Sequence, residues 1–239
     1  MRARNAICLG PNCRLKKNPD AMAVTILDER PSPAHTTRGT VLFADLRGYT
    51  TLAEQLRPVS VVDLLEEFFT VLAEAIDSQG GTVFHAAGDS LMAGFGLSEL
   101  GAAPVQRAVD AGRRIVESFA PVSERWQRRL GVATGVGVGL NVGELAVTAL
   151  GPAHLRRQTL IGDTVNIAAR LCQRARAGEV LLSSTVVESL EQPVSTEVIA
   201  LPDLALRGRG TLVRIYCVPA RERIVLEYSA EDTAAQAQA

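Results

Sequence analysis

The chain contains few of the residues that build zinc sites, disulfides or membrane spans. It has three His in 239 residues, and its four cysteines are scattered as Cys8, Cys13, Cys172 and Cys217. Scattered cysteines are typical of a reducing compartment, and Cys8 and Cys13 give only a weak zinc signal because a matching second pair is lacking. The chain also lacks a run of about 20 apolar residues and the apolar core of a signal peptide. We therefore expect a cytoplasmic protein without a membrane partner.

Net charge excludes a further class of partner. The formal net charge is −1 at pH 7, so no general positive field would recruit nucleic acid or an anionic membrane surface. We therefore expect no nucleic-acid partner. The contents of 47% apolar and 21% charged residues are ordinary for one or two globular domains.

The sequence divides into three expected segments. Residues 1–36 mix Pro, Asn, Lys and Arg without periodicity, which predicts an arm or linker too short for a sensor domain of ordinary size. A compact domain is expected over residues 37–220. Residues 221–239 are expected to form a C-terminal tail, which is Ala- and Gln-rich from Glu231 and is expected to be frayed there.

Within the compact domain, strand-type apolar runs alternate with helical periodicity. Strands are expected over residues 40–44, 82–86, 91–95, 132–140, 144–150, 180–182, 198–201 and 212–218. Helices are expected over residues 49–56, 58–79, 103–129, 162–174 and 183–190, with Pro121 breaking or kinking the third. Because the strands and helices follow no strict βαβ repeat, we expect an α+β sandwich of ferredoxin-like type. Its sheet should be mixed, mainly antiparallel and flanked by helices.

Two aspartates stand beside expected strands. Asp45 follows the apolar run 41–44, and Asp89 lies in the tip of the expected hairpin. Taken alone, Asp45 could be a helix cap and Asp89 a turn residue. If their strands are neighbours, both carboxylates meet at one sheet edge, where they repel each other unless a divalent cation lies between them. The pair therefore predicts a site for two hard cations and a phosphate ester.

Two further features could complete such a site. The backbone amides of residues 46–50 lie where a strand gives way to a helix, a place that binds phosphate through free N–H groups. Asn166 and Arg170 are four residues apart and share one helix face, where they could hold a ribose oxygen and a developing phosphate charge. The alternative is an ordinary surface pair. The glycines at 135, 137, 139 and 143 miss the dinucleotide-binding spacing, so close backbone packing explains them better.

These motifs resemble the class III nucleotidyl cyclases, the catalytic domains of adenylate and guanylate cyclases. The matching segments are LFADLRGYT at 42–50, GG at 80–81 with GD at 88–89, MAGFG at 92–96 and IGDTVNIAAR at 161–170. Their order and spacing agree with the family over residues 37–220. The resemblance implies a head-to-tail homodimer with shared active sites.

The resemblance also implies roles for individual residues. Asp45, Asp89 and the backbone carbonyl of Leu46 would hold two Mg²⁺ or Mn²⁺ ions. From the partner subunit, Asn166 would orient the ribose and Arg170 would stabilise the transition state of 3′-hydroxyl attack on the α-phosphate. The phosphate contacts would come from Arg47, Gly48, Tyr49, Thr50 and Arg207, with Arg209 as a substitute for Arg207 and a solvated turn as the alternative.

Base recognition is where the sequence departs from the family. Adenylate cyclases of the family usually carry Lys four residues before the second metal Asp, and here that position is His85. The second base-reading position is Thr159, a common choice in bacterial adenylate cyclases. A neutral His could donate to adenine N1 or accept from the adenine amino group, or it could simply pack on a strand. We expect an adenylate cyclase that converts ATP to 3′,5′-cyclic AMP, the alternatives being another base preference or a silent nucleotide-binding module.

Overall fold

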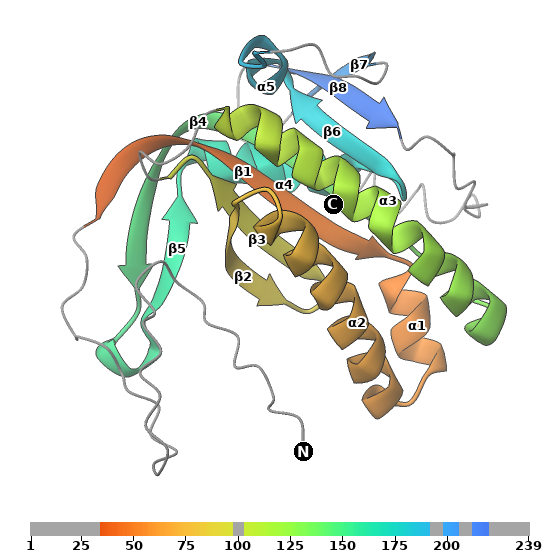
Figure 1. Cartoon of the computed structure of the whole chain (residues 1–239). Coiled ribbons are helices and arrows are strands. Elements are labelled where there is room, and N and C mark those ends of the chain that lie inside the picture. Colours follow the sequence, from red (N-terminus) through yellow and green to blue (C-terminus); the bar gives the residue numbers. More distant parts are fainter. Residues whose placement is uncertain (1–33, 98–102, 192–197, 206–211, 220–239) are drawn as a thin grey trace.

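An eight-stranded sheet forms the centre of the molecule (Figure 1). The structure is a computed structural model, and it describes residues 34–97, 103–191, 198–205 and 212–219. The strand order is β2-β3-β1-β4-β6-β8-β7, with β5 paired to β4, and every pairing is antiparallel except that of β4 with β6. The strands are β1 His35–Arg47, β2 Thr82–Ala87, β3 Ser90–Phe95, β4 Gly135–Leu150, β5 Arg157–Ile161, β6 Glu179–Ser183, β7 Ile199–Leu204 and β8 Val213–Pro219.

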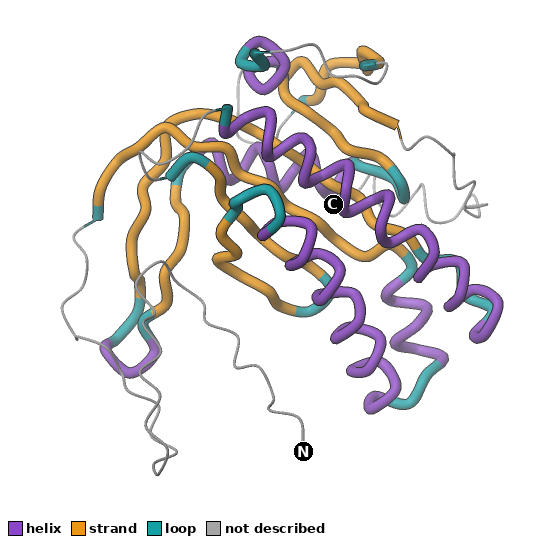
Figure 2. Tube along the Cα trace, viewed as in Figure 1, coloured by secondary structure: helices purple, strands orange, loops and turns teal. Residues whose placement is uncertain are grey.

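Helices cover both faces of this sheet, which confirms the expected α+β fold. α2 and α3 lie side by side over one face, and α4 lies on the other (Figures 1 and 2). The helices are α1 Tyr49–Gln55, α2 Pro58–Asp77, α3 Pro104–Leu130, α4 Asp163–Arg174 and α5 Ser184–Glu188, with a short 3₁₀ turn at Ala153–Leu155.

The central strand β1 shows how the sequence divides these two faces. Leu42, Ala44 and Leu46 belong to the core beneath α2 and α3. Val41 and Phe43 pack in the smaller cluster on the α4 side. Because side chains alternate along a strand, Asp45 and Arg47 fall on the α4 side as well. The period of two thus directs the candidate carboxylate toward α4.

β4 corrects one prediction. Residues 135–150 form a single strand rather than two, because β4 pairs with β1 along its length from Gly135 to Val147. The turn-favouring Asn141 lies inside this ladder, where its buried amide donates to the Thr164 carbonyl (3.1 Å) and its oxygen accepts from Ser183 (2.7 Å). Tertiary hydrogen bonds therefore hold Asn141 within one continuous strand, where the sequence predicted a break between residues 140 and 144.

Three other elements differ from expectation. β1 extends beyond the predicted run 40–44, since backbone pairing with β4 does not require apolar side chains. β5 was not predicted and forms by pairing with the far end of β4. Pro121 does not break α3, whose neighbouring residues Phe119, Val122 and Trp126 are buried in the core. That burial outweighs the backbone hydrogen bond which proline removes.

The glycines of β4 confirm the prediction of close backbone packing. A Cβ at Gly139 would lie 2.5 Å from the Ala168 oxygen in α4, and one at Gly143 would lie 2.6 Å from the Thr164 hydroxyl. A Cβ at Gly135 would meet Ala177, just beyond α4, at 2.5 Å. The glycines of β4 therefore allow α4 to lie directly on the strand.

We predict that Gly139→Ala forces α4 away from the sheet, because the new methyl group would collide with helix backbone that cannot rotate aside. The expected loss in the free energy of unfolding is about 3 kcal/mol, at the upper end of overpacking effects. Chemical denaturation measures it. Gly131→Ala is the control, because a Cβ there meets open space and only the φ of +74° opposes it, at a cost of about 1 kcal/mol. Equal losses in both variants would contradict the direct seating of α4.

Candidate functional site

The structure brings Asp45 and Asp89 together at one end of the sheet. β1 and β3 are neighbours, and Asp45 pairs with Ser90. The ladder continues by one bond, in which the Leu46 N–H donates to the Asp89 carbonyl at 2.9 Å. Asp89 lies in the two-residue turn that joins β2 to β3, with Gly88 supplying the positive φ of 59°. The expected convergence of the two acidic residues is therefore present.

Burial makes the charge of Asp45 unfavourable. Its pKa is raised first by removal from water and further by the nearby carboxylate of Asp89, while the guanidinium of Arg47 opposes the rise. The side chain keeps 26% of its exposure, so it is not sealed off. A partly open, desolvated carboxylate beside a second one is the electrostatic setting that a divalent cation relieves.

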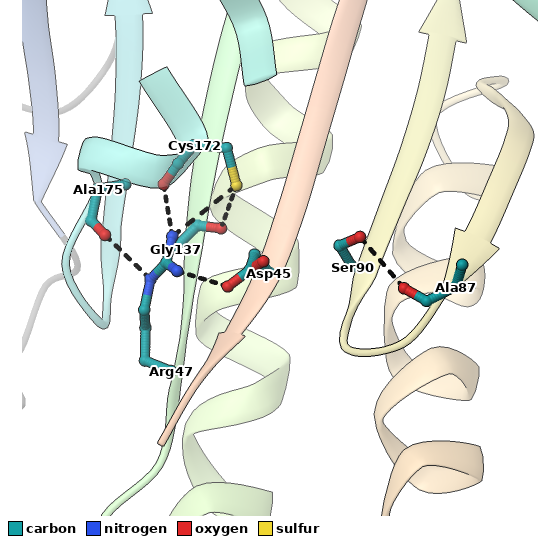
Figure 3. A network of polar contacts seen from close by, with 7 residues as sticks. All are labelled: Asp45, Arg47, Ala87, Ser90, Gly137, Cys172 and Ala175. Atoms are coloured by element: carbon teal, nitrogen blue, oxygen red, sulfur yellow. Dashed lines mark hydrogen bonds and ion pairs between the residues drawn. The ribbon is translucent and has the colours of Figure 1, made fainter. Parts of the chain in front are cut away.

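Arg47 lies beneath the C-terminal end of α4 rather than in solvent (Figure 3). Its guanidinium pairs with Asp45, donates through Nε to the Ala175 carbonyl at 3.0 Å, and donates to the Cys172 carbonyl. Only 15% of its side chain is exposed. The guanidinium is therefore engaged within the protein and does not offer the predicted phosphate contact in this arrangement.

Cys172 contributes packing to this region and not a thiolate. Its thiol donates to the Gly137 carbonyl at 3.4 Å (Figure 3). Burial raises the pKa of the Cys172 thiol to about 12. The group therefore stays protonated at neutral pH and does not offer a soft metal ligand. The donors near Asp45 are oxygens, which suit hard cations.

The start of α1 has the backbone form expected of a phosphate-binding turn. Gly48 has a φ of +85°, and a side chain there would overlap the Ala133 carbonyl. The first helical bond runs from the Leu52 N–H to the Gly48 carbonyl (3.1 Å). No side chain caps this helix start, so the N–H groups of Tyr49 and Thr50 precede the hydrogen-bonded part of the helix. Their binding of phosphate stays a prediction.

Asn166 and Arg170 lie on the outer face of α4. Both are exposed, while the opposite face packs on the sheet through Thr164, Ile167, Ala168, Leu171 and Cys172. In the part of the chain that the structure describes, neither side chain makes a hydrogen bond or ion pair. The chain therefore brings the two aspartates together but turns Asn166 and Arg170 away from the sheet on which Asp45 lies.

A β-bulge in β2 determines the direction of His85. The register shifts between Val83 and His85, so that Val83 pairs with Ala93 while His85 pairs with Met92. Met92 belongs to the cluster on the α4 side, and directly paired residues share a face. The bulge thus places exposed His85 on the α4 side, whereas plain alternation from Val83, which packs with the core under α2 and α3, would place it on the opposite face. The sequence offered no signal for the bulge.

The remaining candidates are only partly covered by the structure. Thr159 is half-buried on β5, which comes close to β2. Arg207, Arg209, Cys8 and Cys13 lie outside the described residues. Among the residues that are described, no group of three or more His, Cys, Asp or Glu could hold a metal ion. A cation bound by Asp45 and Asp89 would thus need further oxygens, such as the Leu46 carbonyl, water or a nucleotide phosphate.

Comparisons with known proteins agree with one another. The family profile described as "Adenylate and Guanylate cyclase catalytic domain" matches residues 33–219. The chain is 27% identical over 191 residues to an adenylate cyclase of Anabaena cylindrica. It is 31% identical over 178 residues to an uncharacterized protein of Mycobacterium tuberculosis. Two similar solved structures are the adenylyl cyclase CyaB from P. aeruginosa (TM-score 0.73, 26% identity) and a guanylyl cyclase (TM-score 0.70, 27% identity).

The extent of these matches differs between sequences and structures. The match covers 78% of this chain but 38% of the Anabaena protein, and 73% of this chain but 31% of the Mycobacterium protein. The chain thus spans about a third of the length of these two relatives. The structural matches cover 81% and 78% of this chain, and 99% and 94% of the two solved chains. None of the helices in the described ranges is both long and apolar enough to cross a bilayer.

We predict that Asp45→Asn stabilises the protein at pH 7 when divalent cations are absent. The carboxyl pKa is raised in the folded chain, so wild-type stability falls as the pH rises through the folded-state pKa. The neutral amide removes this loss, and the thermal unfolding midpoint should rise by a few degrees. The difference should vanish below pH 3.8, the usual pKa. Exposed Asp203 on β7 supplies the control variant Asp203→Asn, which should change little; a lower midpoint for Asp45→Asn would contradict the prediction.

Proposed function

This chain belongs to the family of adenylate and guanylate cyclase catalytic domains, the class III nucleotidyl cyclases, and on that premise we propose that it converts ATP to 3′,5′-cyclic AMP and pyrophosphate at a site shared by two copies. One observation carries the proposal. Asp45 and Asp89 lie together at one end of the sheet, whereas Asn166 and Arg170 face outward from α4. In a dimer, Asn166 and Arg170 of one copy would act with Asp45 and Asp89 of the other.

The acidic half fits two Mg²⁺ or Mn²⁺ ions. It offers hard oxygen donors from Asp45, Asp89 and the Leu46 carbonyl, and partial burial of Asp45 makes its ionised carboxylate favour a bound cation. When bound, such ions supply charge neutralisation for the triphosphate and lower the pKa of the 3′-hydroxyl. The backbone N–H groups at Gly48, Tyr49 and Thr50 would contact the phosphates.

The α4 half would act on the same nucleotide from the partner copy. Asn166 would hold the ribose so that its 3′-oxygen faces the α-phosphorus. Arg170 would stabilise the charge that develops as the new O–P bond forms and the bond to pyrophosphate breaks. The proton of the 3′-hydroxyl would pass to solvent water in that step, and pyrophosphate would leave. Both side chains reach outward from a helix whose opposite face is held by β4, so their positions are set by the sheet.

The base would lie near His85 and Thr159, and its identity is the finer part of the proposal. The structural relatives include an adenylyl and a guanylyl cyclase at nearly equal identity. Exposed His85 on the bulged strand favours one alternative, a cyclase that accepts GTP, pyrimidine nucleotides or several bases. We favour ATP because a neutral imidazole can bond to either polar group on the adenine edge.

We predict that Asp45→Ala and Arg170→Ala each lower cyclase activity about 100-fold or more. Mixing the two inactive variants should restore about a quarter of the wild-type rate, because half of the dimers are mixed and each has one intact site of two. Cyclic nucleotide formation with Mn²⁺ and ATP measures both effects. Arg128→Ala, exposed on α3 across the sheet, should keep the wild-type rate.

Two outcomes would contradict this proposal. Failure of the mixed variants to recover activity would count against a shared site. Binding of ATP without release of pyrophosphate would instead support a nucleotide-binding regulatory module.

We predict that ATP is preferred in a competition among the four nucleoside triphosphates. His85→Ala should reduce the ratio of kcat/KM for ATP over GTP about 3- to 10-fold, the effect of one base-reading hydrogen bond. Mass analysis of the cyclic products measures the ratio. His35→Ala, exposed at the start of β1, is the control and should leave it unchanged. Products formed equally from all four nucleotides would favour the loose-specificity alternative.

A further inference from the structure

Arg47 connects the acidic half of the site to α4 within one chain. We propose, resting on the proposed function, that Arg47 is a positioning residue: its guanidinium holds the Asp45 carboxylate in place for metal binding by fixing it to the C-terminal end of α4. The contacts of this guanidinium run to Asp45 on β1, to the carbonyls of Cys172 and Ala175 at the helix end, and to the Cys172 sulfur (Figure 3).

The fold makes room for this guanidinium. Gly137 on β4 lies directly against it, and a Cβ there would be 2.8 Å from both Nε and Nη2 of Arg47 and 2.9 Å from the Ala175 oxygen. The side chain is also largely buried, with 15% exposure. A chance surface ion pair would have neither a glycine beside it nor two backbone acceptors beyond it.

The helix end is a strong anchor for a cation. Carbonyls of the last turn lack the i+4 partners of the helix interior and carry the negative end of the helix dipole. The Cys172 carbonyl accepts from the Ala175 N–H at 3.1 Å as well as from Arg47. A guanidinium presents its donors in a rigid, planar fork and stays charged at any relevant pH. Arg47 therefore remains attached to α4 whether or not Asp45 binds a cation.

The contact with Asp45 leaves the carboxylate able to bind metal. A carboxylate offers lone pairs on both oxygens, and Arg47 occupies part of one, Oδ1. The contact restricts rotation of the side chain and offsets repulsion from Asp89 while the site is empty of cations. Partners of metal ligands in this position orient the ligand, and their loss typically weakens metal binding about 10- to 100-fold.

The arrangement also links the two halves of the proposed site. α4 carries Asn166 and Arg170 on its outer face, and its end accepts the hydrogen bonds of Arg47. One guanidinium thus fixes the carboxylate that serves one active site and the helix that serves the other. A shift of the Asp45 carboxylate would reach α4 directly, because the same guanidinium is hydrogen-bonded to both.

Two variants separate positioning from a mere charge effect. Arg47→Lys keeps the charge but loses the fork, and Arg47→Met loses both while keeping an unbranched chain. If charge alone mattered, the Lys variant would bind Mn²⁺ like wild type and the Met variant would bind it more tightly. If Arg47 positions Asp45, both variants bind Mn²⁺ about tenfold more weakly. Titration of Mn²⁺, followed by the EPR signal of the free ion, measures this without turnover.

The controls use the same strand and the same guanidinium. Arg38→Met removes an exposed arginine of β1 whose contact is with Ser189, and Mn²⁺ affinity should not change. Gly137→Ala displaces the Arg47 side chain without removing it and should weaken binding as the Lys variant does. Hydrogen exchange gives a second readout: Mn²⁺ should slow exchange at residues 171–178 in wild type but not in Arg47→Met.

The outcomes distinguish this inference from the proposed function. Wild-type affinity in Arg47→Lys, or tighter binding in Arg47→Met, would overturn the positioning role while leaving the cyclase reaction intact. Unaltered Mn²⁺ affinity in Asp45→Asn would overturn both, because the carboxylate would then hold no metal. Cyclic AMP formation by wild type together with weaker Mn²⁺ binding in both Arg47 variants would support both.

Discussion

The direct seating of α4 on the glycines of β4 is the constraint on which the site depends. Side chains at Gly137 or Gly139 would occupy space that the helix backbone and the Arg47 guanidinium now fill. Because no side chain separates the two elements, the end of α4 comes within hydrogen-bond reach of β1. The close approach of helix and sheet thus brings together residues that are far apart in the sequence. It also gives α4 one fixed orientation.

That orientation explains why the two aspartates and the pair Asn166 and Arg170 do not face a common site within one chain. The face of α4 with Ala168 and Cys172 is buried against the sheet, so the face with Asn166 and Arg170 must point outward. Asp45 lies on the sheet beneath the helix end and is paired with Arg47, and Asp89 lies in the neighbouring turn between β2 and β3. Sharing a site between copies is the direct way for outward-facing polar groups to meet such carboxylates, which is the geometric basis of the proposed dimer.

Much of the fold could be read from periodicity, and its exceptions have particular causes. The hairpin around Gly88, the helix start at Tyr49 and the Ser183 cap of α5 were predictable because each depends on residues a few positions apart. The continuous β4 and the added strand β5 were not, since their hydrogen bonds come from partners distant in sequence. Asn141 would favour a turn by its own preference, and only the partners at Thr164 and Ser183 made it acceptable inside a strand.

The sequence by itself determined the family, the strand-end position of Asp45, the turn position of Asp89 and the shared helix face of Asn166 and Arg170. These follow from spacing and local backbone chemistry, which act over a few residues. Only the tertiary structure decided that the Arg47 side chain turns to α4, that a bulge sets the direction of His85, and that the two halves of the site face apart. Each of these depends on how closely α4, β1 and β4 approach, and local sequence does not encode such distances between elements.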